Sequence, residues 1–142
     1  MSDTCDSRPL IHRMEIRVRY QETDGQGHVH HSNYLNYFEV ARTEMLRTWG
    51  KSYRDMEESG SVLVIVHAEC DYHIPARFDD VLTIETKLVR AKGVRLRHEY
   101  SISREQDTIC TGHTIVACVD PTGKPKRLPD WMQIKQTAAS ET

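Results

Sequence analysis

The chain has 142 residues, the usual length of a single domain. Its 19 Lys and Arg residues against 21 Asp and Glu residues give a net charge of −2, without the basic excess that typifies nucleic-acid-binding proteins. No apolar run approaches the roughly 20 residues that a membrane-spanning helix needs, and the first twelve residues contain no apolar segment of a secretory signal. We therefore expect one cytoplasmic domain, residues 1–142, that binds no nucleic acid and has no membrane span.

The first predicted element is a strand that follows a loose leader. Residues 1–12 show no periodic pattern and are expected to be a flexible tail. From residue 13 to residue 20 charged and apolar side chains alternate, and this period of two predicts a half-buried strand. The strand is expected to end at 23–27, where two glycines favour a turn.

A long helix is predicted next. Apolar residues recur mostly at three- and four-residue steps from Tyr34 to Trp49, which is typical of a helix with one apolar face. Ser32 and Asn33 are candidate N-caps, and Gly50 is the expected C-terminal stop. The pattern predicts a helix of about 16 residues.

The second half of the chain is predicted to form an antiparallel sheet. A short helix is expected from Ser52 to about Glu58, and 133–142 is expected to be a second flexible tail. Four segments rich in β-branched and aromatic residues, separated by turn residues, predict strands at 62–72, 81–91, 94–104 and 108–119. The fold class is therefore α+β, with an antiparallel sheet of about five strands around one long helix.

The segment that joins the first strand to the long helix carries the most informative chemistry. It places Asp24 at a strand end, before a glycine-containing loop and the first turn of the helix. Such a turn exposes free backbone N–H groups and a partial positive charge, which can hold an anion or a developing oxyanion. A nearby carboxylate could attack a carbonyl or activate a water molecule. The residues alone leave open that Asp24 is only a turn residue.

Histidines cluster in the same segment, at positions 28, 30 and 31. Imidazoles at alternate positions could meet on one face of an extended chain and hold a metal ion. The nearby acids Glu22 and Asp24 complete no recognised zinc spacing, so we predict no metal and no cofactor. Glu22 is expected to be a solvated charge; the alternative is that it approaches Asp24 and raises the pKa of that carboxyl.

Matches to a known family extend over about residues 13–130. They are Arg17-Val18-Arg19-Tyr20, Thr23-Asp24, Gly27, His31, Tyr34, the run 39–47, and later echoes at 72–76, 80–83 and 119–129. On these residues the chain resembles the 4-hydroxybenzoyl-CoA thioesterase family. Within that family it is most similar to the acyl-CoA thioesterase branch associated with the Tol–Pal cell-envelope system.

The resemblance implies a hotdog fold, in which a curved antiparallel sheet wraps the long helix. It also implies a homodimer whose sheets join edge to edge, often paired again into a homotetramer. The implied activity is hydrolysis of a small or medium acyl-CoA. The catalytic aspartate of the family falls on Asp24, acting as nucleophile or general base, and the histidine of this branch falls on His31. Tyr20, Gly27 and Tyr34 complete the motif and are expected to bind the substrate.

Two further histidines and a helix carboxylate are also candidate site residues. His28 and His30 stand where relatives commonly carry apolar or aromatic residues, which implies a more polar acyl pocket. A sister class of hotdog thioesterases carries its catalytic carboxylate on the helix, where this chain has Glu39, and Glu39 is accordingly expected at the substrate-binding site. The alternative is that Glu39 pairs with Arg42 on a solvated helix face.

The coenzyme is expected to bind basic side chains. Arg90 and Lys92 lie near a predicted turn and are candidates for holding its phosphates, although exposed turns commonly carry charge in any case. In related thioesterases the nucleotide binds across a subunit interface.

Two other functions remain open on the sequence. A hotdog enoyl hydratase would pair Asp with His, but in a different sequence setting from that of Asp24 and His31. A non-catalytic module would bind acyl-CoA or acyl carrier protein and serve a partner complex.

Overall fold

The computed structural model describes residues 8–134, so what was predicted for 1–7 and 135–142 lies outside the described residues. The elements in chain order are β1 (Ile11–Arg17), a 3-10 turn (Tyr20–Glu22), α1 (Ser32–Thr48), α2 (Tyr53–Glu58), β2 (Val62–Tyr72), β3 (Val81–Lys92), β4 (Arg95–Arg104), β5 (Asp107–Val119) and a closing 3-10 turn (Asp130–Met132). None of the helices between residues 8 and 134 has the length and apolar character that crossing a membrane requires.

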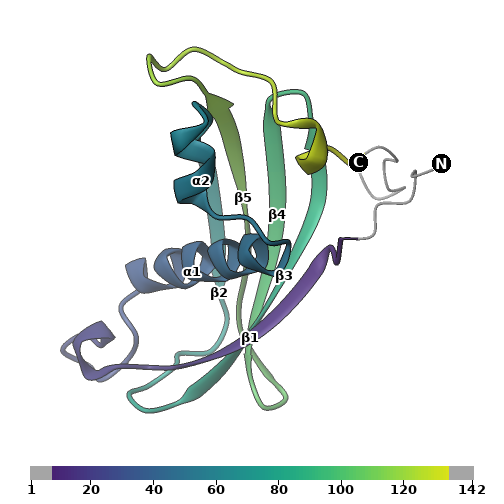
Figure 1. Ribbon diagram of the computed structural model, residues 1–142. Helices are drawn as coiled ribbons and strands as arrows, with labels where there is room; N and C mark the ends of the chain where they lie inside the picture. The colour runs from purple at the N-terminus through teal and green to yellow at the C-terminus, as the bar shows by residue number, and fades with distance from the viewer. Residues whose placement is uncertain (1–7, 135–142) are drawn as a thin grey trace.

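The five strands form one antiparallel sheet in the order β1-β3-β4-β5-β2. Figure 1 shows α1 lying across one face of this sheet, with α2 beside it. The predicted α+β class, with an antiparallel sheet packed on one long helix, is confirmed. The strand order leaves β1 and β2 at the two edges of the sheet.

The centre of the core is a close approach between α1 and β5. Phe38 on α1 is fully buried, and its ring stacks on that of Tyr100 with centroids 4.1 Å apart. Opposite this ring, β5 has Gly112, where an added Cβ would lie 2.3 Å from the carbonyl oxygen of Glu69 and 2.9 Å from the Phe38 ring. Only glycine lets the helix and the two strands come this close.

The first strand lies earlier in the chain than predicted. Residues 11 and 12 pair with Lys87 and Thr86 on β3, so the strand begins inside the predicted leader 1–12. The N–H of Val18 donates instead to the carbonyl of Asp80, and the chain then closes a 3-10 turn at Tyr20. The alternation of apolar residues continues past the last paired residue, which is why the pattern placed the strand end too late.

The predicted tail 133–142 begins too early by at least one residue. Gln133 is buried: its side-chain nitrogen donates to the carbonyl of Leu128, and its side-chain oxygen accepts from the N–H of Gly93. This side chain therefore fastens the end of the described chain to the β3–β4 turn.

The predicted start of α1 is wrong in its capping residues. Ser32 is the first helical residue, and its N–H donates to the ring Nδ1 of His30 at 3.2 Å. Asn33 points elsewhere, with its side-chain amide donating to the carbonyl of Glu22 at 2.9 Å. The His30 imidazole therefore takes the place of a polar cap. The predicted stop is confirmed, because Gly50 follows the helix at a φ of 79°.

His98, on β4, is 5% exposed, and its Nδ1 has no hydrogen-bond partner among the described residues. Burial, aided by the positive charge of Arg42, lowers the pKa of His98 to about 3. The unfolded chain takes up this proton near the ordinary pKa of about 6.5. The folded chain takes up the proton only near pH 3. The contribution of neutral His98 to the free energy of unfolding is therefore complete above pH ~6.5 and is lost progressively as the pH falls below that value.

We expect His98→Gln to weaken this pH dependence, because the substituted side chain does not titrate. Denaturant unfolding of wild type and variant at pH 7.5 and pH 4.5 measures the effect. The free energy of unfolding should fall less over this interval in the variant than in the wild type. Equal losses in the two proteins would contradict the burial of a neutral imidazole.

Candidate active site

Asp24 lies in a loop that its own side chain closes. Its Oδ1 accepts hydrogen bonds from the N–H groups of Gln26 at 2.8 Å and His28 at 3.2 Å, and its N–H donates to the carbonyl of His28. Gly27 stands at a φ of 83°, a left-handed conformation that favours glycine. The bond from Gln26, followed by that from His28, lowers the pKa of Asp24 below its ordinary value. The carboxylate is therefore charged at neutral pH.

The same loop geometry occurs a second time in the chain. Oδ1 of Asp120 accepts from the N–H groups of Thr122 at 2.9 Å and Lys124 at 3.0 Å, and Gly123 has a φ of 94°. The N–H of Asp120 also donates to the carbonyl of Lys124, as that of Asp24 does to His28. The hydrogen-bonded turn thus does not by itself mark Asp24 as a reactive residue. Asp24 differs from Asp120 in that it lines a pocket.

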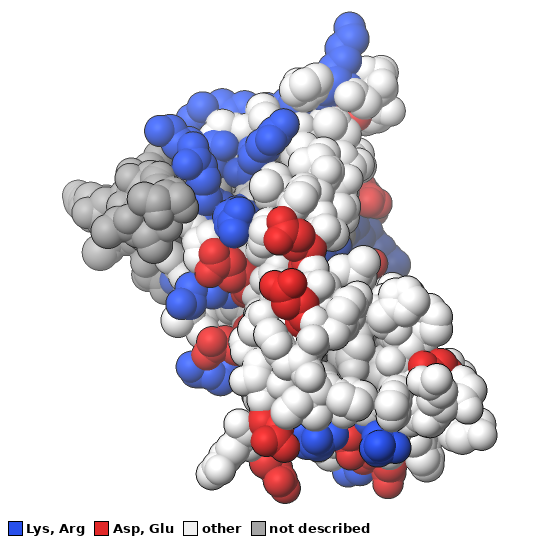
Figure 2. All heavy atoms as spheres, turned by 180° about the vertical axis from the view of Figure 1, so that it is seen from behind, with Lys and Arg blue, Asp and Glu red and all other residues white. Residues whose placement is uncertain are grey.

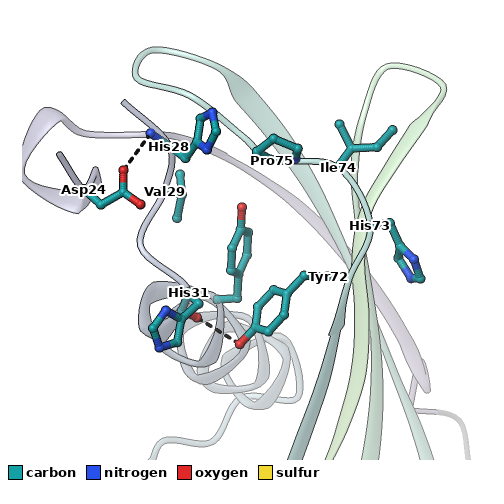
Figure 3. A pocket seen from close by; sticks show the side chains of 9 residues that line it. Asp24, His28, Val29, His31, Tyr72, His73, Ile74 and Pro75 are labelled. Carbon is teal, nitrogen blue, oxygen red and sulfur yellow. Dashed lines mark hydrogen bonds between the residues drawn. The ribbon is translucent and has the colours of Figure 1, made fainter. Parts of the chain in front are cut away.

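Asp24 borders a hollow of about 220 Å³ at the start of α1 (Figure 3). Its walls come from the loop after β1, the first turn of α1, and the end of β2 with the segment that follows it. The lining residues are Asp24, His28, Val29, His31, Tyr34, Tyr72, His73, Ile74 and Pro75. Three of the predicted site residues, Asp24, His31 and Tyr34, are therefore brought together.

His31 immediately precedes α1 and lines the hollow at the start of this helix. Its carbonyl accepts a hydrogen bond from the hydroxyl of Tyr72 at 3.2 Å (Figure 3). Its ring stacks on that of His30 with centroids 4.2 Å apart. No acceptor among residues 8–134 takes the backbone N–H of His31. His31, which lines the hollow, therefore carries a free N–H at the positive end of the helix dipole.

Two tyrosine rings form the apolar side of the hollow. Tyr34 is 3% exposed, its hydroxyl accepts from the N–H of Ala76, and its ring lies 5.5 Å from that of Tyr72. Burial raises the pKa of Tyr34 and raises that of Tyr72 to about 12. Both phenols are therefore uncharged at neutral pH, and Asp24 is the carboxylate that lines the hollow.

Glu22 is not the solvated charge that the sequence predicted. It is 8% exposed, and its Oε1 accepts from the N–H of Arg19 and the hydroxyl of Tyr37, both at 2.8 Å. Burial alone would raise the pKa of Glu22, but these hydrogen bonds outweigh it and lower the pKa. Glu22 therefore fastens the loop to α1 and does not line the hollow.

Tyr20 and Glu39 do not line the hollow. Tyr20 is 75% exposed and packs edge-on against Phe78 with centroids 5.6 Å apart. Glu39 is exposed on α1, whereas Arg42 is buried and donates to the hydroxyl of Tyr100 at 3.4 Å. The predicted pairing of Glu39 with Arg42 on the helix surface is therefore wrong, because Arg42 turns toward the sheet.

Arg90 and Lys92 lie far from the hollow within one chain. They stand at the end of β3, whereas the segment bordering the hollow precedes the start of that strand at Val81. A strand rises about 3.3 Å per residue, so most of the length of β3 separates them from Asp24. A site that combines these residues needs a second copy of the chain.

The end of β2 and the residues after it are the part of the hollow for which the sequence predicted no role. Tyr72, His73, Ile74 and Pro75 line it, held in place by the N–H groups of His73 and Ile74, which donate to the carbonyl of Ile109. The signal was the match of 72–76 to the family pattern. Because residues 72–76 lie far from Asp24 in the sequence, the match did not show that they line the same site.

Comparisons with known proteins match most of the chain. Residues 18–136 match the family described as the thioesterase-like superfamily. The chain is 35% identical to the acyl-CoA thioester hydrolase YbgC of Escherichia coli, over 84% of this chain and 90% of that protein. It is 38% identical to the acyl-CoA thioesterase YbgC of Haemophilus influenzae, over 78% of this chain and 82% of that one. The crystal structure of a DHNA-CoA thioesterase from Staphylococcus aureus superposes with a TM-score of 0.80 at 32% identity, over 83% of this chain and 80% of that one.

Proposed function

This chain belongs to the thioesterase-like superfamily and is a thioester hydrolase, and we propose that it hydrolyses acyl-CoA at the hollow beside Asp24. One observation carries the proposal. Asp24, an ionised carboxylate, and His31, whose backbone N–H has no acceptor among residues 8–134, line the same hollow at the start of α1. The carboxylate supplies reactivity, and the N–H supplies a positive dipole for the carbonyl oxygen.

This sparse set of groups suits a thioester. The carbonyl carbon is electrophilic, and the departing thiol has a pKa of roughly 8.5, so no strong general acid is needed. In the mechanism we propose, Asp24 attacks the carbonyl carbon, the C–S bond breaks, and coenzyme A leaves as thiolate. Water then cleaves the mixed anhydride and restores the carboxylate. As a general base, Asp24 would instead deprotonate the water that attacks the carbonyl carbon, with the same products.

The acyl group that the hollow fits is small or medium in size. A volume of about 220 Å³ bordered by the Tyr34 and Tyr72 rings offers an apolar surface for the acyl chain. His28 and His73 add polar groups to the lining, whereas His30, the other histidine expected to make the pocket more polar, does not line it.

We propose a homodimer, paired into a homotetramer, as the working form. Edge strand β2 exposes Val64, Ile65 and Val66 at 38–48%, an apolar edge that a second copy would cover. Arg90 and Lys92 from a neighbouring copy are proposed to hold the phosphates of coenzyme A. A cytoplasmic location follows from acyl-CoA as substrate, and membership of the Tol–Pal-associated branch rests on the resemblance of the Asp24 segment.

A thiol-release screen tests the activity. The purified chain is incubated with short, long and aromatic acyl-CoA esters in the presence of a chromogenic thiol reagent, and hydrolysis of at least one class is expected. Hydration of crotonyl-CoA without thiol release would favour a hydratase, and binding without thiol release would favour a non-catalytic module. Either result would contradict the proposed function.

The role of the helix start is tested by two substitutions at His31. Its φ of −56° suits proline, which removes the backbone N–H, whereas alanine removes only the imidazole. We expect His31→Pro to lower kcat by about 10²–10³-fold, as loss of an oxyanion donor does. A smaller loss in His31→Ala would measure the contribution of the ring. Equal kcat in His31→Pro and His31→Ala would show that the N–H polarises nothing.

A further inference from the structure

A second group of ionisable side chains lies on the outer face of the sheet, away from α1. His67 and Glu69 alternate along β2 and so point to the same side, and the strand register places His113 of β5 directly opposite Glu69. Neighbouring positions on β5, such as Gly112, face the helix. Figure 2 views the molecule from behind, and acidic side chains stand near the middle of that view with basic ones gathered above them.

The three side chains converge on one point. Nε2 of His67 lies 3.0 Å from Oε1 of Glu69, and Nε2 of His113 lies 3.7 Å from the same oxygen. All three atoms fall within 4.8 Å of one another. Zinc bonds of about 2.0–2.1 Å in tetrahedral geometry place ligand atoms roughly 3.3 Å apart. Small side-chain rotations would therefore bring the three atoms to coordination distance.

We propose that His67, Glu69 and His113 bind a late first-row transition-metal dication, with Zn²⁺ as the ion of choice. Two imidazole nitrogens and one carboxylate oxygen suit such ions, whereas Mg²⁺ and Ca²⁺ prefer oxygen ligands throughout. Three protein ligands leave at least one coordination position to water. The ion would join edge strand β2 to β5 through side chains, in addition to the backbone ladder.

The other charges near these ligands come from β4, where the positive charge of Arg97 acts on Glu69. On β4, Glu99 stands opposite His113 on the other side and pairs with Arg97 at 3.5 Å. Within the described part of the chain, the ion pairs of Glu69 are with the two histidines. Its side chain is 60% exposed and that of His67 is 47% exposed, so both can adjust, whereas His113 at 16% is more firmly held.

Metal titration of the full chain tests the proposal. After treatment with a chelator, the protein is titrated with ZnCl₂ by calorimetry, and about one Zn²⁺ per chain is expected. His113→Ala and, as a second variant at an exposed position, His67→Ala should each weaken binding by more than the roughly 10–100-fold that losing an outer-shell partner costs. Replacing Zn²⁺ by Co²⁺ should give d–d bands without thiolate charge-transfer absorption.

Two control variants make the assignment specific. Glu99→Gln removes a carboxylate from the same face, and the double variant His30→Ala/His31→Ala removes the other histidine cluster; both should keep the wild-type affinity. The absence of stoichiometric binding would overturn the proposal. So would affinity that survives His67→Ala and His113→Ala, affinity lost in the double variant, or a thiolate band in the cobalt spectrum.

Discussion

Replacing Asp24 by Asn is expected to lower kcat for acyl-CoA hydrolysis by about 10²–10⁴-fold while leaving the fold intact. The amide oxygen of Asn can still accept the N–H groups of Gln26 and His28, so the loop keeps its shape. The amide can neither attack a carbonyl nor accept a proton from water. Steady-state release of coenzyme A gives kcat, and thermal denaturation verifies the fold.

Asp120→Asn is the matched control for this variant. Asp120 accepts the same main-chain hydrogen bonds from the second and fourth residues after it, and one more from the Thr122 hydroxyl, but it does not line the hollow. Its substitution therefore reproduces the structural change without the chemical one, and kcat should stay near the wild-type value. Near wild-type turnover in Asp24→Asn, or equal losses in both variants, would remove Asp24 from the mechanism.

The largest effect on stability is expected from Gly112→Ala. The added methyl group would lie 2.3 Å from the Glu69 carbonyl oxygen, a backbone atom, and 2.9 Å from the Phe38 ring. The Phe38 ring is fully buried and stacked on Tyr100, so it cannot move without disturbing the core. We expect the free energy of unfolding to fall by at least the ~1–3 kcal/mol typical of overpacking. Denaturant unfolding measures this change.

Gly25→Ala provides the control for the same chemical change. A methyl group added at this position would have nothing within 4 Å of it, and the φ of Gly25 is outside the left-handed region. Stability should therefore stay within about 0.5 kcal/mol of wild type. If Gly112→Ala were equally neutral, α1, β2 and β5 would not approach one another as closely as described.

The fold could be predicted largely because its signals are local. The four strands of the second half agree with the predicted ranges to within one or two residues, since β-branched runs and turn residues determine them. The first strand was misplaced because its ends depend on pairing with β3, about seventy residues away. Alternation in sequence cannot show where such a ladder stops.

The candidate site divides in the same way. Asp24, His31 and Tyr34 are close in sequence and could be recognised together. Tyr72 lies 41 residues after His31, and only the fold brings its hydroxyl to the His31 carbonyl. The burial of Glu22 likewise depends on Tyr37 and Arg19, and no local pattern of charge reveals it.

The paired loops at Asp24 and Asp120 bear on how a reactive group can arise. In each loop hydrogen bonds lower the pKa of the aspartate: from the main chain at Asp24, and from the Thr122 hydroxyl and then the main chain at Asp120. The negative charge therefore exists before any substrate binds. One loop stands beside a helix start and the other does not. A loop aspartate that is already ionised can therefore become a reactive group when the residues around it change, without any change in the aspartate itself.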